Sequence, residues 1–241
     1  MNKIHRSQRN AAVAGFDALV FRDEAQRADR HALKALLAET GLPVLALNCE
    51  MGGTTGCAAI PGMEAQARRE IDAAIEAATD IGAGAVHVPA GSADNRHARE
   101  TFLSNLRFAL DATDLTVLIE PISRRRVPGY FLNNIEHAAD IIDEISDPRL
   151  KIIFDVYHVM VESGDVYGPL RRHAGKTALV QISSFPERSE PEGGEIDFAR
   201  LLPTFTSAGY AGAFDCEYVP ATTVEAGLGW RDRLRDRMDA A

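Results

Sequence analysis

The sequence predicts an α/β fold of the parallel (β/α)8, or TIM, barrel type. Short apolar runs rich in β-branched residues alternate with longer segments of helical period along the whole chain. Most of the short runs are apolar throughout, which is typical of parallel strands that are buried on both faces. No linker, low-complexity segment or shift in composition divides the chain, so we interpret residues 1–241 as a single barrel domain.

The strands are expected at seven of these apolar runs. In chain order they are Phe16–Phe21, Pro43–Asn48, Ala85–Pro89, Leu115–Glu120, Lys151–Asp155, Ala178–Ser183 and Ala213–Tyr218.

Helices are expected between the strands because apolar residues there recur every three or four positions. Gly41, Gly82 and the pair Asp147-Pro148 follow such stripes and act as stop signals. The residues that form the stripes are Leu33, Leu36 and Leu37; Ile71, Ile75 and Ala78; Phe102, Leu103, Leu106 and Leu110; and Ile135, Ala138, Ala139, Ile142 and Ile145. A last, highly charged helix is expected at about Val224 to Met238.

The beginning of the chain departs from a complete barrel, which has eight strands. A helix is expected at Ser7–Ala14, and the run Phe16–Phe21 follows it directly. The first strand is therefore absent, or poorly encoded in Met1–Asn10. Such a barrel would expose two strand edges, so a homo-oligomer that covers them is one expectation.

Composition excludes several classes of protein. Lys plus Arg number 26 and Asp plus Glu 35, so the net charge of −9 argues against general binding to nucleic acid or anionic membranes. No apolar run approaches the roughly 18 residues of a membrane span, and the polar N-terminus does not resemble a secretory signal. The three cysteines, Cys49, Cys57 and Cys216, are too few and too scattered for a disulfide framework. We therefore expect a cytoplasmic protein.

Polar residues end four consecutive expected strands. They are Glu120, Asp155, Gln181 and Glu217. Chemistry in a parallel barrel takes place at these strand ends, so the four side chains are expected to face one pocket. Carboxylate and amide oxygens are hard ligands that suit Mg²⁺ or Mn²⁺, and a divalent cation would offset the repulsion between the acids.

Several long motifs in the same order resemble the hydroxypyruvate isomerase family, which belongs to the xylose-isomerase-like barrels. The resemblance covers nearly the whole chain from about Ala11. The motifs are Ile119-Glu120-Pro121-Ile122-Ser123, Val127-Pro128-Gly129-Tyr130-Phe131-Leu132-Asn133, Phe154-Asp155-Val156-Tyr157-His158, Val180-Gln181-Ile182, Arg188 with Glu190-Pro191 and Gly194-Glu195, Gly209-Tyr210, Cys216-Glu217-Tyr218 with Pro220, and Gly227-Leu228-Gly229-Trp230.

The resemblance implies a role for each residue of the site. Glu120 and Glu217 correspond to two catalytic glutamates that also bind metal, and Asp155 and Gln181 to the remaining metal ligands. The positions that match substrate contacts or the pocket wall are His158, Arg188 and His87. Judged without the resemblance, Arg188 is better explained by a surface salt bridge and His87 by a buried structural role, while for His158 the structural and functional roles are equally good.

The implied reaction is an aldose–ketose isomerisation of a small hydroxy-carbonyl acid. Hydroxypyruvate, or a related 2-oxo sugar acid, would be converted through an enediolate, with hydroxypyruvate giving tartronate semialdehyde (2-hydroxy-3-oxopropanoate). A divalent metal would stabilise the enediolate, and the two glutamates would move the proton. Arg188 would bind the substrate carboxylate.

Four departures from the family pattern bear on the substrate. The first strand is missing, Val20 stands where the family has a glutamate, and Arg126 replaces an acid six residues after Glu120. In addition, Ser189 replaces the histidine of an RHEP motif. The triplet Arg124-Arg125-Arg126 is more simply read as a solvated loop, and its functional interpretation is a substrate pocket with added positive charge.

Two other functions on the same scaffold stay open. A ketose 3-epimerase usually has histidine where Gln181 stands, so Gln181 argues mildly against it. A degenerate, non-catalytic barrel would explain the missing strand but not the retention of all four ligand positions. A metal-dependent nuclease is the least favoured, because the chain offers few histidines at strand ends for a multi-zinc site.

Overall fold

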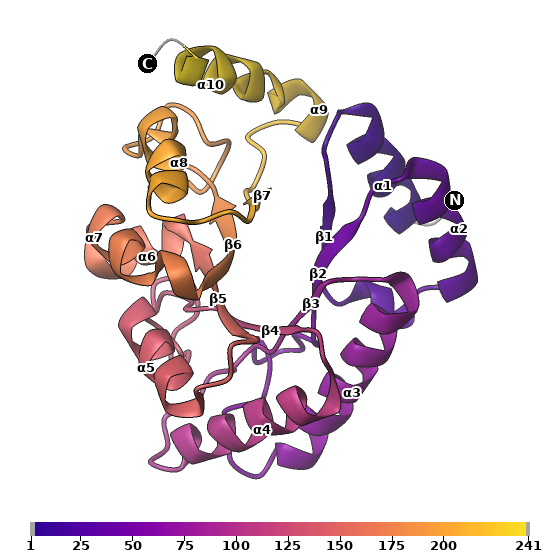
Figure 1. Cartoon of the computed structure of the whole chain (residues 1–241), viewed down its shortest axis with the longest axis vertical. Coiled ribbons are helices and arrows are strands. Elements are labelled where there is room, and N and C mark those ends of the chain that lie inside the picture. Colours follow the sequence, from indigo (N-terminus) through magenta and orange to yellow (C-terminus); the bar gives the residue numbers. More distant parts are fainter. Residues whose placement is uncertain (1–2, 240–241) are drawn as a thin grey trace. The chain divides into compact units, whose positions relative to one another are not determined.

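The computed structural model describes residues 3–239 of the 241-residue chain (Figure 1). These residues form two compact units. The first unit comprises the described residues up to Ile119, together with Val127–Leu132 and Glu144–Lys151. The second unit comprises Glu120–Arg126, Asn133–Asp143 and the described residues from Ile152 onward.

The first unit is built on a parallel sheet in which strands that are consecutive in sequence are neighbours. Its strands are β1 (Leu19–Phe21), β2 (Val44–Asn48), β3 (Ala85–His87) and β4 (Thr116–Ile119). Helices cover one face of these strands (Figure 1). They are α1 (Lys3–Val13), α2 (Arg30–Thr40), α3 (Glu64–Ile81) and α4 (Ala98–Ala112), with a short 3₁₀ helix, η1, at Glu24–Arg27.

Local sequence accounts for the bounds and burial of these helices. The Asp29 side chain accepts a hydrogen bond from the Ala32 backbone N–H at 3.0 Å and thereby begins α2. Gly41 ends the same helix in the left-handed conformation, at φ +70°. In α3 the buried residues recur at helical spacing and include Ala67, Ile71, Ala74 and Ala78, so one stripe of the helix packs inward.

The second unit contains three strands that pair in parallel, β5 (Leu150–Asp155) with β6 (Thr177–Ile182) and β6 with β7 (Ala213–Cys216). The first two residues of β5 belong to the first unit. The helices of the second unit are α5 (Ile135–Ile145), α6 (Val156–Ser163), α7 (Tyr167–His173), α8 (Phe198–Ser207), α9 (Val224–Gly227) and α10 (Gly229–Asp239), with a 3₁₀ helix, η2, at Ala174–Lys176.

An aromatic cluster packs α8 against β5 and β7. The ring of Phe205 lies edge-on to those of Phe154, at 5.1 Å between centroids, and Phe214, at 5.9 Å. Tyr210 joins the same cluster, and its hydroxyl accepts from the Val180 N–H at 3.1 Å and donates to the Ala213 carbonyl at 2.5 Å. These contacts fix β6 beside β7, the two strands that carry Gln181 and lead to Glu217.

All seven expected strands are present in residues 3–239, most of them shorter than the apolar runs that predicted them. The expected helix Ser7–Ala14 is wrong at its start, because α1 already begins at Lys3. The single helix expected at Val224–Met238 is also wrong: Leu228, between two glycines, separates α9 from α10.

Within residues 3–239 the chain begins in helix α1, and no strand precedes β1. None of the described helices is long and apolar enough to cross a membrane. That residues 1–241 form one domain stays a prediction.

Candidate active site

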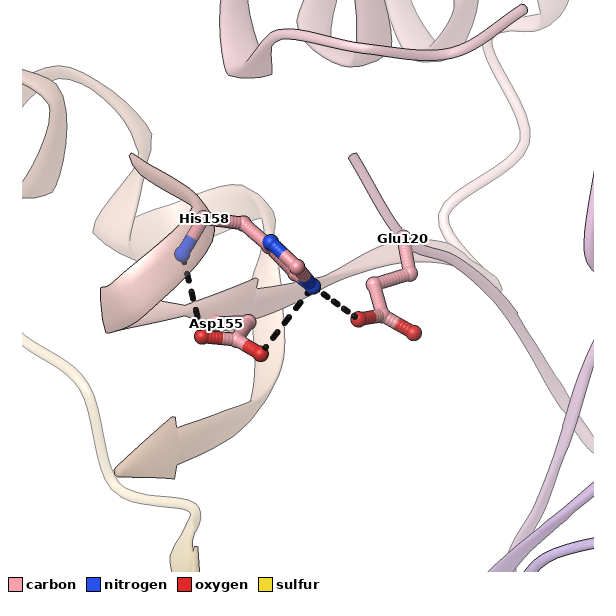
Figure 2. A group of neighbouring side chains, drawn as sticks. All are labelled: Glu120, Asp155 and His158. Carbon is pink, nitrogen blue, oxygen red and sulfur yellow. Dashed lines mark hydrogen bonds and ion pairs between the residues drawn. The ribbon is translucent and has the colours of Figure 1, made fainter. Parts of the chain in front are cut away.

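Three buried side chains of the second unit meet at the ends of β4 and β5. Glu120 follows the last residue of β4, Asp155 is the last residue of β5, and His158 lies in the first turn of α6. His158 Nε2 lies 3.6 Å from Asp155 Oδ2 and 3.9 Å from Glu120 Oε1 (Figure 2). Each residue offers one ligand atom, and the three atoms lie within 4.8 Å of one another. We call these residues the acid–histidine cluster.

The strand-to-helix junction explains how Asp155 and His158 come together. Asp155 Oδ1 accepts hydrogen bonds from the backbone N–H groups of Tyr157, at 2.8 Å, and His158, at 3.2 Å. The carboxylate is thus the N-cap of α6 as well as the end of β5. Because one oxygen holds the helix start, the other, Oδ2, faces the His158 imidazole.

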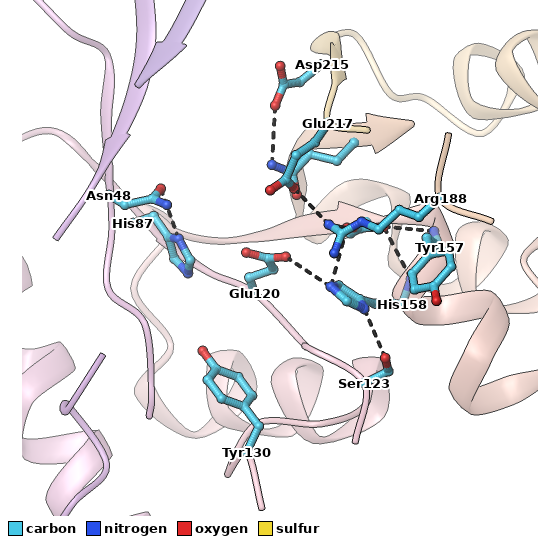
Figure 3. A network of polar contacts seen from close by, with 12 residues as sticks. Asn48, His87, Glu120, Ser123, Tyr130, Tyr157, His158, Arg188, Asp215 and Glu217 are labelled. Carbon is cyan, nitrogen blue, oxygen red and sulfur yellow. Dashed lines mark hydrogen bonds and ion pairs between the residues drawn. The ribbon is translucent and has the colours of Figure 1, made fainter. Parts of the chain in front are cut away.

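Arg188 supplies a positive charge to this cluster. Its Nη2 donates to Asp155 Oδ2 at 2.8 Å. The same Nη2 donates to Glu217 Oε2 at 3.2 Å (Figure 3). The guanidinium also lies over the Tyr157 ring, 5.3 Å from its centroid. Arg188 adopts φ +57°, a conformation that is unusual for a residue with a Cβ. Two backbone hydrogen bonds hold it there, from Arg188 N–H to the Ser184 carbonyl and from Val219 N–H to the Arg188 carbonyl.

Gln181 and Asp215 face each other across β6 and β7, where they are register partners. The Gln181 Nε2 group donates to Asp215 Oδ2 at 3.2 Å. Gln181 Oε1 is buried and has no hydrogen-bond partner among the described residues. A buried amide oxygen without a donor is costly unless something satisfies it.

The second nitrogen of His158 is also held. Its Nδ1 lies 3.0 Å from the Ser123 hydroxyl, and both side chains are buried (Figure 3). Burial, followed by the charge of Arg188, lowers the pKa of His158 from 6.5 to about 3. The imidazole is therefore neutral at pH 7, with one nitrogen available to accept or to bind a cation.

The carboxylates experience the opposite effect. Burial, followed by the charges of Glu217 and Asp155, raises the pKa of Glu120 well above its ordinary value. Burial also raises the pKa of Asp155, and burial followed by the Glu217 charge raises that of Asp215 from 3.8 to about 7. Glu120, Asp155, Asp215 and Glu217 thus surround one arginine, Arg188, which pairs with Asp155 and Glu217. One positive charge does not balance four carboxylates, so the described site is short of positive charge.

These residues fit a divalent cation. The carboxylates and the unpartnered Gln181 Oε1 are hard oxygen donors, the class that Mg²⁺ and Mn²⁺ prefer. The structure brings Glu120 and Asp155 together with His158, joins Glu217 to Asp155 through Arg188, and joins Gln181 to Asp215. That Glu120, Asp155, Gln181 and Glu217 bind one metal ion stays a prediction.

His87 belongs to the first unit and ends β3. Its side chain is fully buried, and its Nδ1 lies 3.1 Å from Asn48 Oδ1 at the end of β2 (Figure 3). Burial lowers the pKa of His87 from 6.5 to about 3. Its expected place at the wall of a substrate pocket stays a prediction.

Sequence reasoning missed Asp215 as a member of the site. A signal for it was present, because side chains two apart along a strand lie on the same face and Asp215 precedes Glu217 by two. It also missed the contact between Ser123 and His158, which are 35 residues apart and which no local pattern connects.

The chain is similar to several known proteins. A family model described as a xylose isomerase-like TIM barrel matches residues 8–235. The 2-oxo-tetronate isomerase of Cupriavidus necator is 40% identical over 231 residues, which cover 91% of this chain and 88% of that protein. The hydroxypyruvate isomerase of Escherichia coli is 36% identical over 220 residues, covering 86% and 84%.

A solved structure is similar over nearly the same length. The crystal structure of a family 2 AP endonuclease from Brucella melitensis superposes with a TM-score of 0.91 at 30% identity and covers 96% of this chain and 93% of that one. Together the matches confirm the predicted barrel class and the resemblance that the sequence motifs indicated.

Proposed function

This chain belongs to the xylose isomerase-like TIM barrel family, and we propose that it isomerises hydroxypyruvate to tartronate semialdehyde, or a related 2-oxo sugar acid in the same manner. The two named relatives support an isomerase of a small hydroxy-keto acid. The observation that carries the proposal is a set of three acids around one arginine. Glu120 and Asp155 are buried beside His158, and Arg188 pairs with Asp155 and with the exposed Glu217.

The ligands of a Mg²⁺ or Mn²⁺ ion would be Glu120, Asp155, Gln181 and Glu217, with His158 close enough to be a further ligand or to support one. Such an ion would supply polarisation of the substrate carbonyl and hydroxyl oxygens, which acidifies the C–H bond between them. Gln181 supports this set because its Oε1 is buried and faces away from Asp215.

Glu120 and Glu217 would transfer the proton. For hydroxypyruvate, one carboxylate takes a proton from C3, and a carboxyl returns a proton to C2. The hydroxyl proton passes from the C3 oxygen to the C2 oxygen, so atoms and charge are conserved. Burial of Glu120 keeps water from competing for the transferred proton.

Arg188 would bind the substrate carboxylate. Its Nη2 already donates hydrogen bonds to Asp155 and Glu217, and the other nitrogens of the guanidinium group have further N–H groups that can donate. His158 would orient the hydroxyl or carbonyl oxygen of the substrate, since Ser123 fixes its ring. His87 is retained as a proposed contact at the pocket wall.

Melting temperature tests the proposal first. Protein in a chelator is compared with protein in Mn²⁺ or Mg²⁺, and then with each ion plus hydroxypyruvate. Binding at about 100 times the dissociation constant adds roughly 2.7 kcal/mol to the unfolding free energy, so both additions are expected to raise the melting temperature. No rise with either ion would favour the non-catalytic barrel.

Isomerisation is then measured directly with hydroxypyruvate and 2-oxo sugar acids, and a panel of ketoses serves as the comparison. The expected result is conversion of the acids, with a loss of about 10²–10⁴-fold in Glu217→Gln. Epimerisation of ketoses without conversion of the acids would transfer the assignment to a sugar 3-epimerase. A cytoplasmic location and a homo-oligomer stay proposals alongside this one.

A further inference from the structure

The loop that leaves the candidate site carries three consecutive arginines, Arg124, Arg125 and Arg126, which we call the arginine triplet. The residues just before it, Glu120 to Ser123, are buried, whereas all three arginines are exposed. Among the described residues, no ion pair joins any of the three guanidinium groups to a carboxylate. Three adjacent cations without counter-charges repel one another, and this chain is otherwise acidic, with a net charge of −9.

The backbone of the triplet is fixed close to the acid–histidine cluster. The Arg126 N–H donates to the Ser123 carbonyl at 2.9 Å, which closes a turn over Ser123. Ser123 in turn holds His158 through its hydroxyl, at 3.0 Å. The charge of Arg126 also reaches His158, since it contributes, after burial and Arg188, to the lowered pKa of that imidazole.

A cavity of about 320 Å³ in the second unit is lined by one residue of the triplet, Arg124, and by one residue of the cluster, His158. This volume is at the lower end of what small-molecule sites occupy. Arg172 also lines the cavity, but its Nη2 is bound to Glu136 at 2.6 Å. Of the two arginines at this cavity, only Arg124 has a guanidinium without a carboxylate partner among the described residues.

Two acids, Glu162 and Glu136, line the cavity beside Arg124. Glu162 Oε1 accepts the Arg124 backbone N–H at 2.8 Å. This bond fixes the loop to α6 without occupying a guanidinium group. The other acid, Glu136, is paired with Arg172 and His173, so among the described residues neither carboxylate pairs with a guanidinium group of the triplet.

Resting on the proposed function, we infer that the arginine triplet binds a second anionic group, a phosphate or a carboxylate, at the end of the substrate distant from its reacting carbonyl. The substrate class is therefore a dianionic hydroxy-carbonyl acid. Its first carboxylate would meet Arg188, its reacting carbons would lie at the acid–histidine cluster, and its second anion would pass His158 to reach Arg124 and Arg126. Guanidinium groups recognise phosphate and carboxylate through paired N–H donors.

Unreactive analogues test this inference without relying on turnover. Calorimetry of the full-length protein with Mn²⁺ compares glycerate, which has one carboxylate, with 3-phosphoglycerate and tartrate, which each add a second anion. The expected result is binding of a dianion at least about tenfold tighter than glycerate, the gain expected for a charge-assisted hydrogen bond. The two dianions show whether phosphate or carboxylate is preferred.

Variants locate the source of the preference. Arg124→Gln and Arg126→Gln are each expected to reduce the ratio of dianion to glycerate affinity by about tenfold. Arg235→Gln, which removes an exposed arginine from α10, is the matched control and is expected to leave the ratio unchanged. The melting temperature of each variant shows whether it is folded, and Arg126→Lys, which keeps the charge, gives a second measurement if Arg126→Gln does not fold.

Equal affinity for glycerate and both dianions in the wild-type protein would overturn the inference. A ratio that falls as much in Arg235→Gln as in Arg126→Gln would also overturn it, because the effect would then be one of overall charge. Tight binding of duplex DNA that is lost in Arg126→Gln would also overturn the inference, because the triplet would then bind the phosphates of a DNA backbone. Failure of the proposed function is separate, since it is seen as absent isomerisation whatever the analogues bind.

Discussion

The Gln181 amide nitrogen donates to the Asp215 carboxylate at 3.2 Å, and the Gln181 amide oxygen is consequently directed away from Asp215. An ionised carboxylate can only accept, so above its pKa of about 7 Asp215 selects one of the two orientations of the amide. Asp215 therefore engages Gln181 Nε2 and leaves the buried Oε1 without a hydrogen-bond partner among the described residues. This is the orientation that a metal ligand requires.

Asp215→Asn tests whether this orientation matters. An asparagine amide can face Gln181 with either its oxygen or its nitrogen, so the selection is lost while the volume is kept. We expect Mn²⁺ to bind about 10–100-fold more weakly, the usual effect of removing a group that orients a metal ligand. Electron paramagnetic resonance of free Mn²⁺ measures the affinity, and Asp232→Asn on α10 is the control. Equal affinities in Asp215→Asn and wild type would show that Gln181 is not oriented in this way.

Arg188 is expected to stabilise the metal-free protein as an internal counter-ion. Asp155 is 1% exposed and bonded to Arg188 at 2.8 Å, so Arg188→Met would leave a buried carboxylate without its cation. The expected cost is about 3–5 kcal/mol of unfolding free energy in chelator. Mn²⁺ should restore more stability to the variant than it adds to the wild type, because the metal replaces the missing charge.

The control for Arg188 is Arg233→Met, which breaks an exposed pair with Glu192 at 2.6 Å. Exposed pairs contribute about 0–1 kcal/mol, so little change is expected. Denaturant unfolding with and without Mn²⁺ measures both variants. A loss in Arg188→Met no larger than that in Arg233→Met would exclude the counter-ion role.

Much of the fold could be predicted because apolar runs identify parallel strands directly. All seven strands fall within or overlap the expected runs. The three helices after β5 and β6 were not predicted, because their local sequence does not show the pattern of a helix. Helix α6 is apolar on most sides and shows no helical stripe, α7 contains Gly168 and Pro169, and α8 contains Pro203. In each case tertiary packing overrides a weak local preference.

Some residues of the candidate site could likewise be predicted from the sequence, whereas their contacts could not. Asp155 and Gln181 lie in the last two residues of their strands, and Glu120 and Glu217 follow strand ends directly, so their positions depend only on the strand pattern. The contacts of Arg188 could not be predicted, because they require a loop residue at φ +57° to reach an aspartate 33 positions away. Such a contact depends on the path of the loop, which periodicity does not encode.

The Tyr210 hydroxyl is expected to stabilise the folded protein by holding β6 beside β7, next to Gln181. Its hydroxyl bridges the Val180 N–H and the Ala213 carbonyl, and Val180 precedes Gln181. Tyr210→Phe would leave both backbone groups without this partner and is expected to cost about 1–3 kcal/mol. Tyr167→Phe on α7 serves as the control, with an expected change within about 0.5 kcal/mol. Denaturant unfolding measures the free energy of unfolding of both variants. Equal losses of unfolding free energy in the two variants would contradict a specific role for the Tyr210 hydroxyl.

His87 should make the protein lose stability in acid. Burial lowers the pKa of His87 from 6.5 to about 3. Between these two pH values the imidazole is protonated in the unfolded chain but neutral in the folded protein. A group with a depressed folded pKa contributes stability above its unfolded pKa and loses it as the pH falls. Between about pH 6 and pH 4 this loss amounts to roughly 1.4 kcal/mol of unfolding free energy per pH unit.

His87→Gln isolates this contribution, because glutamine does not titrate and can still hydrogen-bond to Asn48. The difference in unfolding free energy between wild type and His87→Gln should be constant above pH 7, which provides the internal control. Below pH 6 the difference should shift steadily against the wild type, as measured by urea unfolding at several pH values. A difference that stays constant down to pH 4 would mean that His87 takes up its proton equally well in the folded protein, and its environment would then have to be polar rather than the buried strand end described above.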